Sequence, residues 1–147
     1  HSGRLLEAVI VGDGIQASMV SDAVRSRAWL HWAPVMSHSD VLDGMSASKA
    51  LIVCSTYEAG PLVLLEAVGL GIPVVTTDVG RVREFVSGYV GRIVRPDAAS
   101  IAAGLNEVLS WDPQWTKNAK NQLMTRLDFR QTMEAIIQEF ERAAIEQ

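Results

Sequence analysis

The sequence contains little cysteine: Cys54 is the single one in 147 residues. An internal disulfide is therefore excluded, which fits a reducing compartment such as the cytoplasm. Cys54 ends an apolar stretch, so we predict an inert thiol at the end of a buried strand rather than a nucleophile. The predicted location is the cytoplasm, with membrane association left open for a longer protein that contains this chain.

Positive charge is also scarce, because 13 Lys and Arg residues stand against 17 Asp and Glu residues, for a net charge of −4. Nucleic acid is thereby excluded as the main partner, since neutralising phosphates requires a surplus of basic side chains. Long apolar runs are missing too: the most apolar stretch, 59–75, is interrupted by Glu66, Gly69, Gly71 and Pro73. We therefore expect no transmembrane helix in this sequence.

Metal-ligand patterns and serine-hydrolase motifs do not occur in the sequence. The three histidines and one cysteine lack the spacing of a metal site. A G-x-S-x-G motif is absent as well, which leaves serine-hydrolase chemistry without support. We expect no metal and no other cofactor.

Two kinds of segment alternate along the chain: short apolar runs and longer stretches typical of helices. Overall, 48% of the residues are apolar. Short runs rich in Val, Ile and Leu predict strands at 8–11, 29–32, 50–54, 73–76 and 90–94. Longer stretches predict helices at 16–27, 39–45 (capped by Ser39 or Asp40), 61–70, 81–86, 98–109, 112–124 and 129–145. This alternation predicts an α/β fold, a Rossmann-like parallel sheet with helices on both faces.

The predicted fold is a single domain over 1–147, with 125–147 as its closing C-terminal helix. The third strand is nearly all apolar, which is typical of a strand buried on both faces of a sheet. Ligands of such sheets bind at the carboxyl ends of the strands. The loops that matter are therefore those after Val11, Trp32, Cys54, Thr76 and Val94.

The loop after the third predicted strand combines three features of an anion site. A helix that begins near Pro61 directs free backbone N–H groups and a positive dipole end at the expected ligand, which suits a diphosphate. Ala59 and Gly60 are small, so a ligand can approach the backbone closely. Glu66 is the only charged residue within 59–75, and a carboxylate on an apolar helix needs a hydrogen-bonding partner. A pair of ribose hydroxyls would provide one.

The segment Tyr57–Ala67, followed by 71–80, resembles the group 1 glycosyltransferases, also called family 4. Glu58 and Glu66 have the spacing of that family's two glutamates, with seven residues between them. Similarity extends outward to 9–14, 92–97 and the stretch from Phe129 onward. The resemblance implies the C-terminal, nucleotide-sugar-binding half of a two-domain GT-B fold, in a retaining and metal-independent enzyme.

The resemblance also implies roles for individual residues. Glu66 holds the ribose hydroxyls of a nucleotide diphosphate sugar, and Glu58 is the catalytic residue that contacts and orients the donor sugar. The remaining implied contacts are the backbone of Ala59, Gly60, Pro61 and Leu62 along the sugar and diphosphate, Val35 against the base, and Gly12 and Gly14 in the cleft wall. The nucleotide sugar is a substrate rather than a cofactor, and the acceptor, a sugar or a lipid, is held by an N-terminal domain.

The sequence departs from the family pattern in two places. Ala59 and Gly60 stand where the family usually has glycine and a bulky aromatic residue, which leaves the donor sugar undetermined. The family's domain also begins with an earlier strand and helix that carry a basic pair for the diphosphate, and nothing before Leu5 matches them. We infer a fragment of a longer protein, or a sheet that a second chain completes.

The 147-residue chain by itself is expected to lack transferase activity, because the acceptor domain and the basic pair are both missing from it. The measurement is sugar transfer by the purified chain from UDP-, GDP- or ADP-linked sugars. Robust transfer would contradict this expectation.

Other interpretations of the same residues stay open. Glu66 could instead form a buried ion pair with Arg81 or Arg83. Glu58 could instead be a solvated loop acid that the dipole of a nearby helix N-terminus favours. The segment 12–17 matches the dinucleotide fingerprint G-x-G-x-x-A, but 28–35 lacks the acid that NAD binding requires. For the whole chain, the alternatives are a non-catalytic scaffold module that pairs with another chain, and a sugar-nucleotide epimerase.

Overall fold

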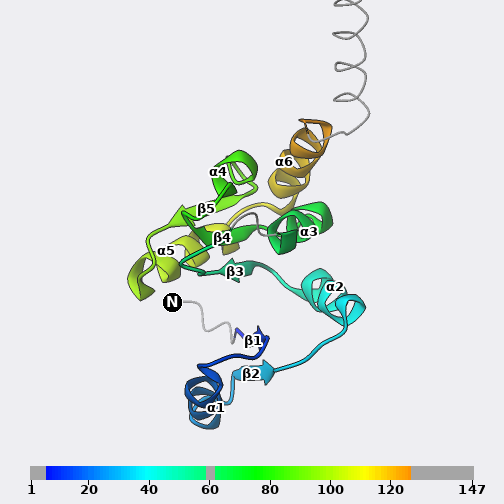
Figure 1. Ribbon diagram of the computed structural model, residues 1–147. Coiled ribbons are helices and arrows are strands. Elements are labelled where there is room, and N and C mark those ends of the chain that lie inside the picture. The colour runs from blue at the N-terminus through cyan, green and yellow to red at the C-terminus, as the bar shows by residue number, and fades with distance from the viewer. Residues whose placement is uncertain (1–5, 59–61, 127–147) are drawn as a thin grey trace, which may run out of the picture. The chain divides into compact units, whose positions relative to one another are not determined.

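Parallel strands and helices alternate along the chain in the computed structural model, which describes residues 6–58 and 62–126 (Figure 1). The chain divides into two compact units, the first ending at Gly44 and the second beginning at Met45. The predicted α/β class with parallel strands is confirmed. The single domain over 1–147 stays a prediction, and the expected helix at 129–145 lies outside the described residues.

The first unit contains a two-stranded parallel sheet. Strand β1 (Ala8–Val11) pairs with β2 (Leu30–Ala33), with Ala8 opposite Leu30 and Val11 opposite Ala33. Helix α1 (Ala17–Arg25) forms the crossover between them. The turn before α1 depends on Gly12, whose φ of 117° is a conformation that side chains with a Cβ rarely adopt. Trp32 holds this turn against β2 by donating from Nε1 to the Gly12 carbonyl oxygen at 2.8 Å.

Helix α2 (His38–Ala47) begins earlier than the sequence predicts. The backbone N–H of Asp40 donates to the Ser37 hydroxyl at 3.2 Å, and that hydroxyl donates in turn to Asp40 Oδ2 at 2.6 Å. Ser37 therefore caps the helix, and the prediction of Ser39 or Asp40 as the cap is wrong. The reason is positional, because an N-cap side chain accepts from the backbone two or three residues ahead.

The second unit is a three-stranded parallel sheet in the order β3-β4-β5. Its strands are β3 (Leu51–Val53), β4 (Val74–Thr77) and β5 (Gly91–Val94). Its helices are α3 (Leu62–Leu70), α4 (Val82–Phe85), α5 (Ala98–Leu109) and α6 (Pro113–Arg126). The central strand β4 is buried along its whole length, so the core of this unit lies around it.

Two glycines lie at closely packed positions on opposite faces of the sheet. Gly104 of α5 lies against Val75 and Val94, where an added Cβ would come within 3.2 and 2.8 Å of their side chains. Gly91 lies against Val74 and Val86 on the other face, since neighbouring residues of a strand point to opposite sides. Helix α5 therefore covers one face of this sheet, and the residue that follows α4 packs on the other.

The ends of the helices follow local chemistry. Gly71, with a φ of 79°, ends α3 as predicted, and the following Ile72 N–H donates to the Ala67 carbonyl at 2.9 Å. Asp97 caps α5 by accepting the Ser100 N–H at 2.8 Å, and this bond lowers the pKa of the Asp97 carboxyl. Within 6–58 and 62–126, no helix has both the length and the apolarity needed to cross a membrane.

Aromatic side chains connect α5 and α6 to the start of β5. The Tyr89 ring lies 5.3 Å from Trp111, edge to face, and 4.8 Å from Trp115. The Arg92 guanidinium stacks over Trp111 at 4.5 Å and donates from Nε to Glu107 Oε1 at 2.8 Å. These contacts anchor the helical C-terminal part of the second unit.

The expectation that Cys54 ends a strand buried on both faces is wrong. Ile52 is 42% exposed and the Cys54 side chain is exposed as well. The reason is the position of β3 in the sheet, because among residues 6–58 and 62–126 it is an edge strand in the β3-β4-β5 order and pairs with β4 alone. Apolar composition predicts a strand, and strand order then decides how much of it is covered.

Candidate functional site

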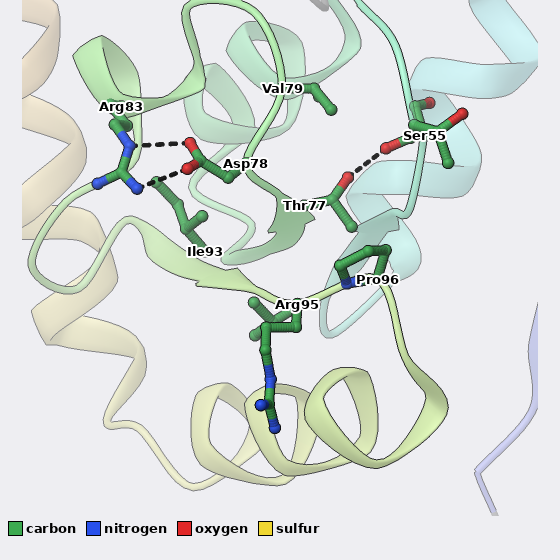
Figure 2. Close-up of a pocket in the computed structure, with 10 residues that line it drawn as sticks. Ser55, Thr77, Asp78, Val79, Arg83, Ile93, Arg95 and Pro96 are labelled. Atoms are coloured by element: carbon green, nitrogen blue, oxygen red, sulfur yellow. Dashed lines mark hydrogen bonds and ion pairs between the residues drawn. The ribbon is translucent and has the colours of Figure 1, made fainter.

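A cavity of about 380 Å³ opens at the carboxyl ends of β3, β4 and β5 (Figure 2). The loop after β3 contributes Ser55 and Thr56, β4 and its loop contribute Thr77, Asp78 and Val79, α4 contributes Arg83, and β5 and its loop contribute Ile93, Val94, Arg95 and Pro96. Three of the five loops indicated by the sequence therefore surround one cavity. This is the edge at which parallel sheets bind their ligands.

Polar groups dominate one wall of the cavity. Arg83 makes a two-pronged ion pair with Asp78, from Nε to Oδ1 at 2.8 Å and from Nη2 to Oδ2 at 2.5 Å. These hydrogen bonds and the charge of Asp78 raise the pKa of Arg83. Arg95 extends along α5 instead, where its Nε donates to the Ser100 hydroxyl at 3.2 Å (Figure 2). The two guanidinium groups therefore point to different sides.

A second ion pair lies beside the first on α4. Arg81 donates to both carboxylate oxygens of Glu84, at 2.7 and 2.6 Å, and this lowers the pKa of Glu84. Among the described residues, both Arg81 and Arg83 thus have carboxylate partners other than Glu66. These carboxylates compete with the ion pair considered for Glu66, which stays a prediction.

Glu58 lies next to the cavity, on the loop that follows β3. Its side chain is half-buried, and its Oε1 accepts a hydrogen bond from the Ser55 hydroxyl at 3.0 Å. Ser55 lines the cavity and its carbonyl oxygen accepts a hydrogen bond from the Thr77 hydroxyl. A carboxylate in this position is held toward the carboxyl edge of the sheet rather than freely solvated.

Glu66 lies on α3, beside the buried residues Leu64, Ala67 and Val68. Its own side chain is half-buried rather than enclosed, so the burial expected from the apolar sequence is only partial. Helix α3 follows the loop that carries Glu58. Both glutamates therefore lie on one strand-to-helix connection, from β3 to α3. Their roles toward a ligand stay predictions.

The other predicted site residues fall into three groups. Ala59, Gly60 and Pro61 lie outside the described residues. Leu62 is the first residue of α3 and is 72% exposed. Gly12 and Gly14 lie in the turn after β1, and Val35, which is 85% exposed, follows β2. These last three residues belong to the first unit. Each of them follows the carboxyl end of a strand in the two-stranded sheet of that unit.

Four residues that line the cavity were not identified as site residues from the sequence: Ser55, Thr77, Asp78 and Arg83. The available signal was the rule that ligands bind at the carboxyl ends of parallel strands, which indicated the loops after Cys54 and Thr76. That rule selects loops, and it does not select side chains within them. The hydrogen bonds between the loops are set by the pairing of β3 with β4.

Comparison with known proteins decides the family. The family described as "Glycosyl transferases group 1" matches residues 4–122 of the chain, which include the first five strands and both glutamates. The chain belongs to the group 1 glycosyltransferases. The resemblance carried by Tyr57–Ala67 is thus confirmed.

Individual relatives of this glycosyltransferase chain agree with the family match. A glycogen synthase of Mycobacterium tuberculosis is 33% identical over 118 residues, which is 77% of this chain and 28% of that protein. The structure of sucrose-phosphate synthase from Thermosynechococcus elongatus superposes with a TM-score of 0.70 at 21% identity, over 95% of this chain and 39% of that one. The lipopolysaccharide outer core galactosyltransferase WaaB gives 0.71 at 23% identity, over 90% of this chain and 41% of that one.

The two solved structures share the fold with this glycosyltransferase chain, at identities that carry no further argument. The chain spans less than a third of the length of its curated relative and about two fifths of each solved one. What the comparisons give is therefore a family and a fold for a part of such a protein.

Proposed function

We propose that this chain is the donor-binding half of a retaining glycosyltransferase, which holds a nucleotide diphosphate sugar for transfer to an acceptor bound by an N-terminal domain. The observation that carries the proposal is the cavity at the carboxyl ends of β3, β4 and β5, with the Glu58 carboxylate held beside it by Ser55. Membership of the group 1 family supports the same substrate class.

In the proposed complex, the two glutamates contact different parts of the donor. Glu66 accepts hydrogen bonds from the ribose hydroxyls, and Glu58 contacts the sugar. The family resemblance further implies contacts of the backbone of 59–62 with the diphosphate, of Val35 with the base, and of Gly12 and Gly14 with the donor. The proposed donor is a hexosyl nucleotide, in keeping with the name of the glycogen synthase relative.

The proposed chemistry needs no metal and no resident cofactor. The bond between the anomeric carbon and the diphosphate oxygen breaks, and a bond to the acceptor oxygen forms on the same face of the sugar. The departing diphosphate takes the proton of the acceptor hydroxyl. The protein contributes fixed hydrogen-bond donors and the Glu58 carboxylate, which stabilise the separated charges in the transition state.

Isothermal titration of the chain with UDP, GDP and ADP tests the proposal. One nucleotide is expected to bind at millimolar concentration or below, because the ribose and diphosphate contacts lie within this chain. We expect a weak affinity because the titrated chain does not contain the basic pair and the N-terminal domain that the family resemblance implies. Failure of all three nucleotides to bind at millimolar concentration would count against donor binding.

The alternative of a scaffold module has one observation in its favour, which is the exposure of apolar side chains on the outer strands. Val9 of β1 is 60% exposed and Ile52 of β3 is 42% exposed. Such surfaces suit pairing with another chain. Light scattering after size-exclusion chromatography separates the two functions: a stable dimer without nucleotide affinity favours the scaffold, and a nucleotide-binding monomer favours the glycosyltransferase.

A further inference from the structure

The loop that carries Glu58 is attached to the central strand by a side chain. Thr77 is the last residue of β4 and is only 2% exposed, and its hydroxyl donates to the Ser55 carbonyl oxygen, 22 residues away (Figure 2). The backbone pairing of β3 with β4 ends one residue earlier, with Val53 opposite Thr76. The Thr77 hydroxyl therefore continues the connection between the two strands just beyond the last paired residues.

Ser55 connects Thr77 to Glu58 through two hydrogen bonds. Its carbonyl oxygen accepts from Thr77, and its hydroxyl donates to Glu58 Oε1 at 3.0 Å. The same residue is thus fixed through its backbone and directs its side chain at the carboxylate. Both Ser55 and Thr77 also line the cavity, so the hydrogen bond between them lies on the cavity wall (Figure 2).

We propose that Ser55 and Thr77 are positioning residues, which hold the Glu58 carboxylate in the orientation that receives the donor sugar. The inference rests on the proposed function and adds the means by which the sheet sets the position of Glu58. A glutamate side chain on a loop has several rotamers, and ordering it on ligand binding costs affinity. A carboxylate that is already oriented by a fixed hydroxyl avoids most of that cost.

The expected effect is confined to the sugar. We define the sugar increment as the ratio of the dissociation constant of a nucleoside diphosphate to that of its glucose conjugate, using UDP with UDP-glucose and ADP with ADP-glucose. Ser55→Ala is expected to reduce this increment about tenfold, since it removes a hydrogen bond to a charged group. Thr77→Val is expected to reduce it about fivefold. In both variants the affinity for UDP or ADP itself is expected to fall by a smaller factor than the sugar increment.

Two control variants separate positioning from a general loss of stability. Thr77→Ser keeps the hydroxyl and is expected to restore the sugar increment. Thr76→Val makes the same chemical change one residue earlier, on the opposite face of β4, where the hydroxyl donates to the Thr77 carbonyl at 3.2 Å. Thr76→Val is expected to leave the sugar increment unchanged, although both threonines are buried.

Amide hydrogen exchange of residues 55–58 gives a second measurement that needs no ligand. Exchange in this segment is expected to become about tenfold faster in Thr77→Val and to stay unchanged in Thr76→Val. The positioning role is overturned by unchanged exchange in Thr77→Val, by an unchanged sugar increment in Ser55→Ala, or by an equal loss in Thr76→Val. Absence of nucleotide binding in the unmodified chain would instead contradict the proposed function, which keeps the two failures distinct.

Discussion

Glu66→Ala is expected to weaken binding of the preferred nucleoside diphosphate about 100-fold, the largest effect on a ligand that we expect from one substitution in this chain. A carboxylate that accepts from two ribose hydroxyls makes two charge-assisted hydrogen bonds, each worth about 1.5 kcal/mol. Their loss corresponds to about two orders of magnitude in the dissociation constant. Isothermal titration with the nucleotide that binds the unmodified chain measures this change.

The 2′-deoxy form of the same nucleotide tests the contact itself. The unmodified chain is expected to bind the deoxy form about tenfold more weakly, because one of the two hydroxyls is gone. Glu66→Ala is expected to bind both forms equally, since the partner of the missing hydroxyl has been removed as well. Discrimination that persists in Glu66→Ala would show that another group recognises the ribose.

Glu107→Ala is the matched control for Glu66→Ala. It removes the same carboxylate from another helix of the second unit, α5, where Glu107 pairs with Arg92 at 2.6 Å. This position is remote in sequence from the loop of Glu58 and does not line the cavity. Nucleotide affinity is expected to stay within about twofold of the unmodified chain, and a comparable loss in both variants would assign the effect of Glu66→Ala to charge or stability.

Gly91→Ala is expected to lower the free energy of unfolding by about 3 kcal/mol, which is at the upper end for overpacking of a core. A Cβ at this position would lie 2.4 Å from the carbonyl oxygen and a side-chain methyl of Val74, and 3.0 Å from Val86. The carbonyl oxygen belongs to the central strand and cannot rotate away as a side chain can. Urea denaturation followed by circular dichroism measures the change.

Gly69→Ala provides the control for this prediction. Gly69 lies within α3, and a Cβ there would meet no atom within 4 Å. Alanine is favoured over glycine in a helix by about 1 kcal/mol, so this variant is expected to be as stable as the unmodified chain or slightly more stable. Equal stability of Gly91→Ala and Gly69→Ala would mean that the strands β4 and β5 separate readily to admit a methyl group.

Strong local patterns predicted the elements of this fold with little error. The apolar run at 8–11 is strand β1 in the structure, and the stretch at 98–109 is helix α5, with Asp97 as its cap. Both are bounded by residues with a clear local role, because Gly12 makes the turn after β1 and Asp97 satisfies the first N–H groups of α5. The start of α2 was missed because Ser37, Ser39 and Asp40 can all cap a helix, and only the backbone geometry selects among them.

The sequence by itself determined the order of strands and helices, the parallel α/β class and the family, because each of these is carried by residues that are close together along the chain. Glu58 and Glu66 stand out in the same way, as two carboxylates on one strand-to-helix connection. Tertiary structure alone decided what surrounds them. Strand order exposed Cys54, Arg83 and Arg81 formed ion pairs with Asp78 and Glu84, and the pairing of β3 with β4 brought Thr77 to Ser55. A contact across 22 residues depends on the register of two strands, and that register is a property of the folded sheet.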